Sequence, residues 1–501
     1  MRPAEAYAEL VRLSREQTVL ASCSDLLEWD EETFMPRGGV EHRAEQVALL
    51  AGILHDRGAD PRFGDLLDRV EGSDLVADPD SPSAVNIREL RREYERERKL
   101  PKDLVEESAR VATLASQAWA DAREAADFRI LTPWLDRIFR LARVEADAVG
   151  FVGSRYDAML EDYEPGMTTP EVTALFAALK PELIRLVGEL STPASVPAHV
   201  LRREFPIDRQ RLFAESVAAG LGFDLERGRI DTAAHPFCTS IGPGDVRIAV
   251  RYHRRNLAMG FFVLLHEVGH GLYDQGIDPV HFGTPMGEAP SLGLHESQSR
   301  LWENFVGRSF GFWRHFFPRL KNIFHESLHD ISLETFVAVI NRVSPGTNRG
   351  GADEVSYNLH IIIRSELEQA MLTGDLPVAD LPGAWNDAYH RYLGVTPKND
   401  ADGCLQDGHW SEGMIGYFPT YTLGNLYAAQ LFAKAEADIG PLDARFGAGD
   451  FSGLLEWLRE RVHRQGCRWP ARDLVARATG TVPTPGPLLR SLETRYRVGP
   501  I

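Results

Sequence analysis

The spacing of hydrophobic residues along the chain predicts a mainly α-helical protein. In the first segment, apolar residues recur at Tyr7, Leu10, Val11 and Leu13, close to the helical period of 3.6 residues. The same period continues through most of the chain. It predicts helices over residues 4–23, 61–70, 84–99, 101–126, 288–307, 333–343, 353–372, 381–393, 419–437 and 454–464, together with helices that end at Gly58 or begin at Thr132 and Thr169.

Strand character is concentrated between residues 228 and 252. This segment alternates in part and carries Val and Ile on both sides of Gly242-Pro243-Gly244, which predicts a short antiparallel hairpin. A strand edge at this place could hold an extended peptide by backbone pairing. A purely structural hairpin explains the pattern equally well, and the sequence leaves both interpretations open.

The stretch from Leu257 to Gly276 carries the strongest chemical signal. Nine mostly apolar residues lead directly into His266-Glu267-Val268-Gly269-His270, the H-E-x-x-H pattern of zinc peptidases. Residues four apart share one helix face at about 5–6 Å between Cβ atoms, so His266 and His270 can bind one metal ion. Glu267 is then close enough to take a proton from water at that metal.

The alternative for this helix is a pair of ordinary core histidines. Glu267 argues against it, because a carboxylate in an apolar run is costly to bury unless it is paired, bound to metal or used chemically. Gly269 and Gly271 also disfavour a helix by about 1 kcal/mol each relative to Ala. We interpret these glycines as room for a metal and a substrate backbone.

A third ligand is needed because catalytic zinc sites usually have three protein ligands and one open position. Glu296, in His295-Glu296-Ser297-Gln298, lies 26 residues beyond His270. This separation suffices for a turn and a second helix that packs on the first. Glu296 is therefore the candidate.

Composition places these motifs in an ordinary globular protein of 501 residues, with 44% hydrophobic and 26% charged residues. No repeat, low-complexity tract or linker divides the chain, so we expect one domain over residues 1–501, with two lobes around a groove as a variant. The net charge of −18 argues against binding to nucleic acid. No apolar run reaches the ~18 residues of a membrane span.

The N-terminal segment is charged and amphipathic and lacks the apolar core of a signal peptide. The four cysteines, at positions 23, 238, 404 and 467, are scattered and form no C-x-x-C motif. This pattern is typical of a reducing compartment. We therefore predict a cytoplasmic protein.

Peptide hydrolysis at such a metal needs a donor for the developing oxyanion. Tyr417 and Tyr421 are candidates, since a phenol is neutral and can donate; two ordinary amphipathic tyrosines are the alternative. His409 and Trp410 fit either a pocket wall or a structural cluster.

A carboxypeptidase also needs a cation for the free carboxylate of its substrate, and Arg349 and Arg364 are the candidates. Arg364 lies four residues before Glu368, which favours an internal ion pair between them. Arg349 lies in a glycine-rich loop, where active-site cations often occur.

Taken together, seven motifs in order resemble the carboxypeptidase Taq family of metallocarboxypeptidases over essentially the whole chain. The stretch from Leu26 to Gly39 also resembles the N-terminal segment of that family. The seven motifs are His235-Pro236-Phe237; Asp245-x-Arg247; the metal helix followed by Gly271-Leu272-Tyr273-Asp274-Gln275-Gly276; the segment from His295 to Asn304; Arg349-x-x-Ala352-Asp353; Gly403-x-x-Gln406-Asp407-x-His409-Trp410; and the segment from Tyr417 to Tyr421.

The resemblance implies a large helical domain with a deep groove, a small antiparallel sheet beside the metal helix, and a shape related to angiotensin-converting enzyme and neurolysin. It implies a homodimer that removes C-terminal residues one at a time, with broad side-chain tolerance and reluctance toward proline. It assigns metal binding to His266, His270 and Glu296, the general base to Glu267, and the carboxylate clamp to Arg349. His409 and Tyr421 would position substrate or oxyanion, and His235 would contact substrate.

Two positions depart from the family pattern. Ala249 stands where the family's D-x-R-x-T motif usually ends in Thr, and Asn348 replaces an Ile before Arg349. Neither touches a predicted ligand, so we expect catalysis to be retained while substrate preference or local stability changes.

Other functions remain open from the sequence. An endo-oligopeptidase or dipeptidyl carboxypeptidase could use the same site, and a metal-stabilised helical scaffold without turnover would not need Glu267. Zinc suits the His/His/Glu set best, although cobalt or manganese could occupy it, since cellular supply also sets occupancy.

Overall fold

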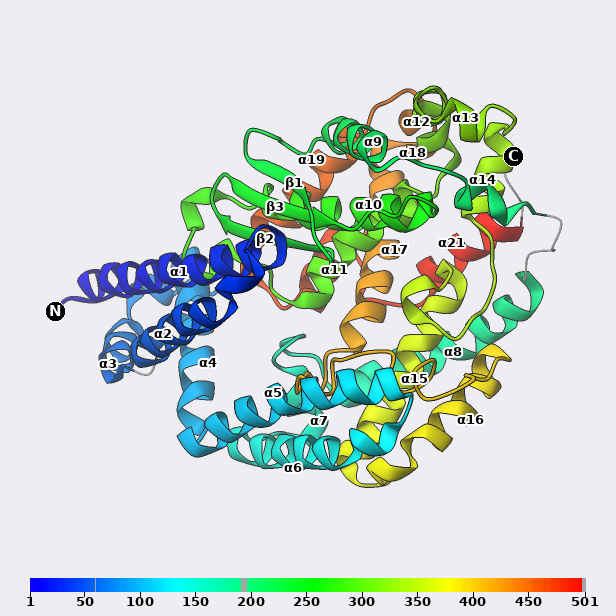
Figure 1. Cartoon of the computed structure of the whole chain (residues 1–501). Helices are drawn as coiled ribbons and strands as arrows, with labels where there is room; N and C mark the ends of the chain where they lie inside the picture. The colour runs from blue at the N-terminus through cyan, green and yellow to red at the C-terminus, as the bar shows by residue number, and fades with distance from the viewer. Residues whose placement is uncertain (59, 191–195, 498–501) are drawn as a thin grey trace.

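The computed structural model describes residues 1–58, 60–190 and 196–497 (Figure 1). Helices dominate, as the hydrophobic spacing predicts. The helices are α1 Pro3–Thr33, α2 Val40–Gly58, α3 Pro61–Val70, α4 Pro82–Lys99, α5 Lys102–Ala125, α6 Thr132–Val149, α7 Arg155–Leu160, α8 Thr169–Leu190, α9 Ile207–Leu221, α10 Leu257–Asp274, α11 Leu292–Arg300, α12 Phe310–Ile323, α13 His325–Leu328, α14 Leu333–Ile340, α15 Glu354–Thr373, α16 Leu381–Leu393, α17 Pro419–Ile439, α18 Leu442–Gly447, α19 Ser452–Arg461, α20 Ala471–Thr479 and α21 Gly486–Arg497.

Most predicted helices are present, with two instructive differences. The first helix continues ten residues past position 23, to Thr33. The helix expected over 288–307 begins only at Leu292, ends at Arg300 and passes directly into a π-helical turn, Leu301–Val306. Helices α7, α9, α12, α13, α18, α20 and α21 were not predicted from the spacing.

Side-chain caps fix where the central helices begin. The Asn256 amide oxygen accepts from the backbone N–H of Met259 at the start of α10, and the Ser291 hydroxyl accepts from Leu294 at the start of α11. At the start of α15, Asp353 accepts from two backbone N–H groups. Each cap satisfies donors that have no partner within the helix.

The predicted hairpin is present, but the sheet is mixed, not antiparallel. Strands β2 Phe237–Gly242 and β3 Asp245–Val250 pair antiparallel around the predicted turn. Strand β1 Gly228–Thr232 pairs parallel with β3, in the order β1-β3-β2. Strands β1 and β2, consecutive in the chain, are therefore not neighbours in the sheet, because β3 lies between them.

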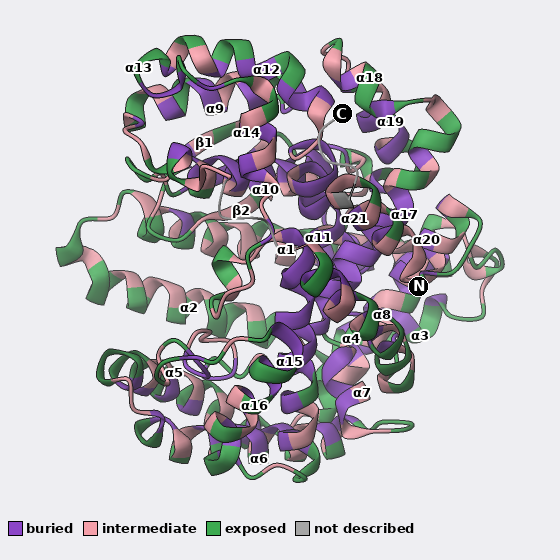
Figure 2. Ribbon diagram, turned by 90° about the vertical axis from the view of Figure 1, so that its right-hand side faces the viewer, coloured by how far each residue is buried: buried purple, intermediate pink, exposed green. Residues whose placement is uncertain are grey.

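Four helices form the buried centre of the molecule. Figure 2 shows burial concentrated along α10, α11, α15 and α17, and α11 packs against both α10 and α17. A second, smaller apolar cluster joins α1, α3 and α4 at one side of the molecule, where α1 packs against β2 of the sheet (Figure 1). The mainly α-helical fold class is therefore confirmed, whereas a single domain over 1–501 stays a prediction.

No described helix combines the length and the apolar character that crossing a membrane requires.

Candidate metal centre

The structure brings His266, His270 and Glu296 together from α10 and α11. Nε2 of His266 and Nε2 of His270 each lie 3.4 Å from Oε2 of Glu296. One ligand atom from each residue lies within 4.8 Å of the other two. Because the histidines are one helical turn apart, both rings face the same side of α10. The three side chains therefore present convergent donors suited to one metal ion.

Two glycines allow this convergence. A Cβ atom on Gly269 would lie 2.6 Å from the carbonyl oxygen of Gln298 and from Cα of Ser299, so α10 and α11 touch backbone to backbone there. A Cβ on Gly424 of α17 would lie 2.8 Å from Cγ of Glu296. Gly269 thus makes room for the third-ligand helix and not for metal or substrate, contrary to our sequence interpretation.

Gly271 also serves helix packing. A Cβ there would lie 2.7 Å from the ring of Phe223 and 3.2 Å from the side chain of Ile248 in β3. The missing side chain of Gly271 thus lets α10 pack closely against the sheet. The expectation that it leaves space for substrate is therefore wrong as well.

Arg300, one turn after Glu296, holds the candidate third ligand. Its Nε donates to Oε1 of Glu296 at 2.6 Å, and the Ser299 hydroxyl donates to Oε2 at 2.9 Å. Burial by itself would raise the pKa of Glu296, but the charge of Arg300 and the contacts with His266 hold it well below its usual value. Glu296 is therefore a carboxylate, the form that binds metal.

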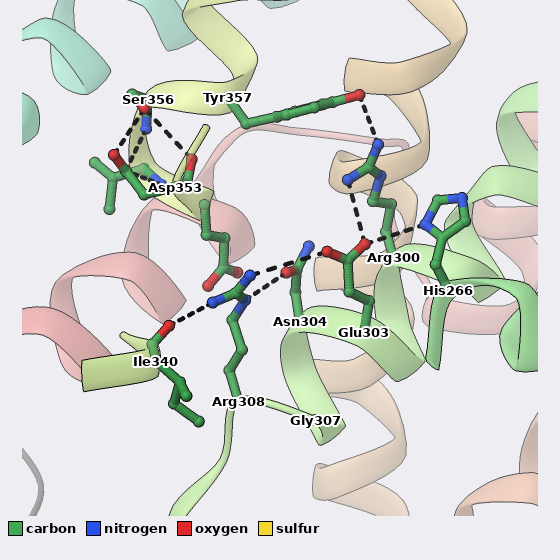
Figure 3. A network of polar contacts seen from close by, with 12 residues as sticks. His266, Arg300, Glu303, Asn304, Gly307, Arg308, Ile340, Asp353, Ser356 and Tyr357 are labelled. Atoms are coloured by element: carbon green, nitrogen blue, oxygen red, sulfur yellow. Dashed lines mark hydrogen bonds and ion pairs between the residues drawn. The ribbon is translucent and has the colours of Figure 1, made fainter. Parts of the chain in front are cut away.

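The far side of His266 faces a second carboxylate. Nδ1 of His266 lies 3.1 Å from Oε2 of Glu303, which is in the π-helical turn (Figure 3). Nη1 of Arg300 also reaches Oε2 of Glu303 at 3.3 Å. His266 is thus held between Glu296 and Glu303.

His270 is held differently. Its ring stacks on the ring of His295, with centroids 4.4 Å apart. His295 in turn contacts Asp274 through Nε2 at 2.9 Å. Burial, and the nearby charge of His295, lower the pKa of His270 to about 4. A neutral imidazole is the form that a metal requires.

Glu267 is buried beside the three candidate ligands, with 7% of its surface exposed. Burial raises the pKa of its carboxyl group to about 7, the neighbouring charges of His266 and Glu296 acting in opposite directions. A carboxyl group with this pKa can both accept and release a proton near neutral pH.

Tyr417 and Tyr421 lie close together although helix α17 begins only at Pro419. Their ring centroids are 5.3 Å apart, and the Tyr421 hydroxyl lies 3.2 Å from Nε2 of His409. Burial raises the pKa of both phenols, so both stay protonated and can donate. Burial, with the charge of Arg349, lowers the pKa of His409 to about 4.

Arg349 is anchored by Asp407 from the loop before α17. Its Nε and Nη2 donate to Oδ1 of Asp407 at 3.0 and 2.7 Å, and its Nη1 donates to the Tyr357 hydroxyl at 3.3 Å. The guanidinium carbon lies 5.1 Å from the ring centroid of Tyr421. These contacts place Arg349 next to the tyrosine cluster, by which we mean Tyr417 and Tyr421.

The spacing in the helix predicts an ion pair between Arg364 and Glu368, but the structure does not contain it. Arg364 is fully buried and contacts Asp407 at 2.6 Å. Glu368 instead accepts from the Tyr156 hydroxyl, the Trp410 indole N–H and the Gly416 backbone N–H. Both residues have stronger partners across the core than along α15, and Arg364 is unavailable to substrate.

The contact of His235 with substrate stays a prediction. His235 is exposed in the connection between β1 and β2, and no hydrogen bond or ring contact joins it to the metal candidates within the described residues. Ala249 is fully buried in the central strand β3, where it pairs with Phe237 of β2 and Asp231 of β1. Asn348 caps the turn that carries Arg349, because its Oδ1 accepts from Gly351 N–H.

A cavity of about 720 Å³ is lined in part by His295, the residue that stacks on the candidate ligand His270. It lies between α1, α4 and the segment that follows α10, and Tyr163, Asp274, Ser291 and His295 are among its lining residues. None of the three candidate ligands is in that lining, so His295 stands between the cavity and His270.

Sequence reasoning missed three residues of this site, namely Arg300, Glu303 and Tyr357. Glu296, Arg300 and Glu303 recur at i, i+4 and i+7, which is one helix face. A buried stripe of alternating charge on such a face was the available signal. Tyr357 carries no comparable signal, because a tyrosine near a helix start is common.

The model of the carboxypeptidase Taq (M32) metallopeptidase family matches residues 9–496. The chain is 48% identical to thermostable carboxypeptidase 1 of Thermus thermophilus, over 99% of both chains, and 36% identical to carboxypeptidase 1 of Bacillus subtilis, over 95% of this chain and 94% of that one. The crystal structure of an M32 carboxypeptidase from Deinococcus radiodurans is similar with a TM-score of 0.95 and 40% identity, covering 98% of this chain and 99% of that one.

Proposed function

The chain belongs to the carboxypeptidase Taq (M32) family of metallopeptidases and is a metallocarboxypeptidase, and we propose that it removes single C-terminal amino acids from peptides with zinc and a glutamate base. One observation carries the proposal: donor atoms of His266, His270 and Glu296 converge within 4.8 Å of one another. Glu267, next to His266 in the sequence, is buried.

The spacing of the donors supports zinc. Ligands at zinc distances of about 2.0–2.2 Å in a tetrahedral arrangement lie roughly 3.4 Å apart. Both imidazole Nε2 atoms lie 3.4 Å from Glu296 Oε2. When bound, the metal supplies Lewis-acid chemistry: it lowers the pKa of water and polarises the scissile carbonyl.

Glu267 is the general base in this proposal. Its carboxylate takes a proton from the attacking water and later passes it to the leaving amine. A pKa of about 7 suits both steps, because the group is partly ionised at neutral pH and holds the proton only transiently.

The tyrosine cluster serves the developing oxyanion. Tyr417 and Tyr421 remain protonated because burial raises their pKa values, so each can donate a neutral hydrogen bond. His409 contacts Tyr421 and orients its hydroxyl.

Arg349 is the clamp for the substrate carboxylate. A guanidinium has five N–H donors. Three of those in Arg349 contact Asp407 and Tyr357, which leaves two for a carboxylate. Arg364 has no exposed surface and serves to hold Asp407. His235, exposed in the β1–β2 connection, stays a substrate contact in this proposal on the family resemblance alone.

The proposal also includes broad side-chain specificity, a homodimer and a cytoplasmic location. Support for these comes from the family resemblance and the scattered cysteines. Product analysis of peptides with varied C-terminal residues and a measurement of molar mass in solution test the first two directly.

The central test is hydrolysis by Glu267→Gln. We expect kcat to fall by about 10²- to 10⁴-fold, because proton transfer by a positioned side chain contributes this much. Bound metal measured by elemental analysis should stay at the wild-type level, because Glu267 is not a ligand. Wild-type turnover in this variant would exclude Glu267 as base.

The nature of the products tests the carboxypeptidase assignment separately. Wild-type enzyme acting on a longer peptide should release single residues in order from the C-terminus, and a chelator should stop the release. Dipeptide or internal products would instead identify a dipeptidyl carboxypeptidase or an endo-oligopeptidase.

A further inference from the structure

Buried charged residues follow one face of the helix that carries the candidate third ligand, and they continue past its end. Glu296, Arg300 and Glu303 follow one another on one face and are all largely inaccessible to solvent. The α-helix ends at Arg300, and Glu303 lies in the π-helical turn that follows. Such turns are rare and are often found at functional sites.

The two candidate histidine ligands differ at Nδ1, the ring nitrogen that points away from the metal position. Nδ1 of His266 lies 3.1 Å from Oε2 of Glu303. Nδ1 of His270 is buried and has no hydrogen-bond partner among the described residues. His270 is held by stacking on His295 instead. A carboxylate therefore orients only His266.

We propose that Glu303 is a positioning residue for the metal: its carboxylate accepts the Nδ1–H of His266 and so leaves Nε2 free to bind. A carboxylate behind a histidine ligand fixes the tautomer and ring orientation and raises the basicity of the ligand. Arg300 completes the arrangement, because it holds Oε1 of Glu296 and Oε2 of Glu303 at the same time. Figure 3 shows its contact with Glu303.

A purely structural role for Glu303 makes a different prediction. Arg308 lies 3.9 Å from Oε1 of Glu303 and also contacts the Asn304 side chain and the Ile340 carbonyl. If Glu303 only neutralised Arg300 and Arg308, its removal would lower the stability of the metal-free protein without a specific effect on metal affinity.

The experiment measures the dissociation constant for zinc by competition with a chromophoric chelator, in the full-length protein. Glu303→Met keeps the size of the side chain and removes the acceptor, whereas Glu303→Gln keeps one acceptor oxygen. Glu354→Met is the matched control, since Glu354 is also buried and accepts from Arg495 and Tyr496 at 2.7 and 2.9 Å without contacting a candidate ligand. Thermal unfolding of the metal-free proteins is recorded in parallel.

We expect Glu303→Met to weaken zinc binding by about 10- to 100-fold, the usual effect of removing such a partner. Glu303→Gln should lose less, and Glu354→Met should bind zinc like the wild type even if it is less stable. Equal zinc affinity in Glu303→Met and the wild type would overturn the proposal, as would an equal loss in Glu303→Met and Glu354→Met.

A second measurement needs no variant. Nitrogen-15 NMR of the histidine rings in the zinc-loaded wild type should show Nδ1 of His266 protonated and hydrogen-bonded. An unprotonated Nδ1 would overturn the proposal even if Glu303→Met failed to fold. The proposal rests on the proposed metal site but not on turnover: a wild type that binds no divalent metal would refute the proposed function itself.

Discussion

Replacing Gly269 by Ala tests whether the contact between α10 and α11 sets the metal site. The added Cβ would lie 2.6 Å from the Gln298 carbonyl oxygen and from Ser299 Cα. Both are backbone atoms, so no side chain can rotate out of the way. The helices must separate by roughly 0.8 Å to restore an ordinary contact of about 3.4 Å.

Two terms oppose each other in the stability of this variant. Overpacking in a well-packed core costs about 1–3 kcal/mol. Ala is favoured over Gly within a helix by about 1 kcal/mol. The metal-free variant should therefore be less stable than the wild type by up to about 2 kcal/mol.

The larger effect should be on metal affinity. A separation of that size would lengthen the contacts from Glu296 Oε2 to the two imidazoles from 3.4 Å to roughly 4.2 Å, too far for ligands of one tetrahedral ion. We expect at least a tenfold weaker metal complex. At saturating metal this removes about 1.4 kcal/mol of metal-dependent stabilisation.

The assay compares urea unfolding with and without zinc, and zinc affinity by chelator competition. Gly188→Ala is the control, because Gly188 lies inside α8 and a Cβ there meets nothing within 4 Å. This control should gain up to about 1 kcal/mol and bind zinc normally. If Gly269→Ala bound zinc as tightly as Gly188→Ala and were equally stable, the argument from helix contact would fail.

Two further predictions concern the clamp and the core. Arg349→Met should lower kcat/KM about 10- to 100-fold on peptides with a free C-terminus, because a charge-assisted hydrogen bond is lost; an equal loss on amidated peptides would count against the clamp. The second prediction concerns Glu368. Burial raises the pKa of Glu368 to about 7, above the value of an unfolded chain. Protonated Glu368 therefore contributes fully to stability below about pH 4.5, and this contribution is lost as pH rises through 7. The wild type should therefore lose up to about 3 kcal/mol between pH 5 and 8 relative to Glu368→Gln, measured by urea unfolding, and parallel pH profiles would contradict this.

The parts of the site that follow from local spacing could be predicted from the sequence. His266 and His270 lie one turn apart in any helix, so their shared face needs no tertiary information. Helix α10 itself was predicted because its apolar run is long and uninterrupted. Glu296 was within reach because the 26 residues after His270 suffice for a second helix that packs on the first, although its packing against α17 could not be foreseen.

The parts that depend on tertiary packing could not be predicted. Arg364 pairs with Asp407 across a loop, because the i, i+4 position of Glu368 is weaker than three donors from elsewhere in the core. The parallel pairing of β1 with β3 depends on the order in which the strands fill the sheet, which hydrophobic alternation does not record. Gly269 looked like space for a ligand because a sequence does not show which backbone approaches it.

A single hydroxyl group joins the proposed clamp to the proposed metal site. The Tyr357 hydroxyl accepts from Nη2 of Arg300 at 2.6 Å and from Nη1 of Arg349 at 3.3 Å. Arg300 holds Glu296, and Asp407 holds Arg349, so the two cations are fixed relative to each other by buried groups on α11, α15 and one loop. An enzyme that removes one residue must keep a constant distance between the terminal carboxylate and the scissile bond. Tyr357 on α15 and the Asp407 carboxylate hold Arg349 in its loop at that distance, whereas an unanchored loop would let the cleavage position vary.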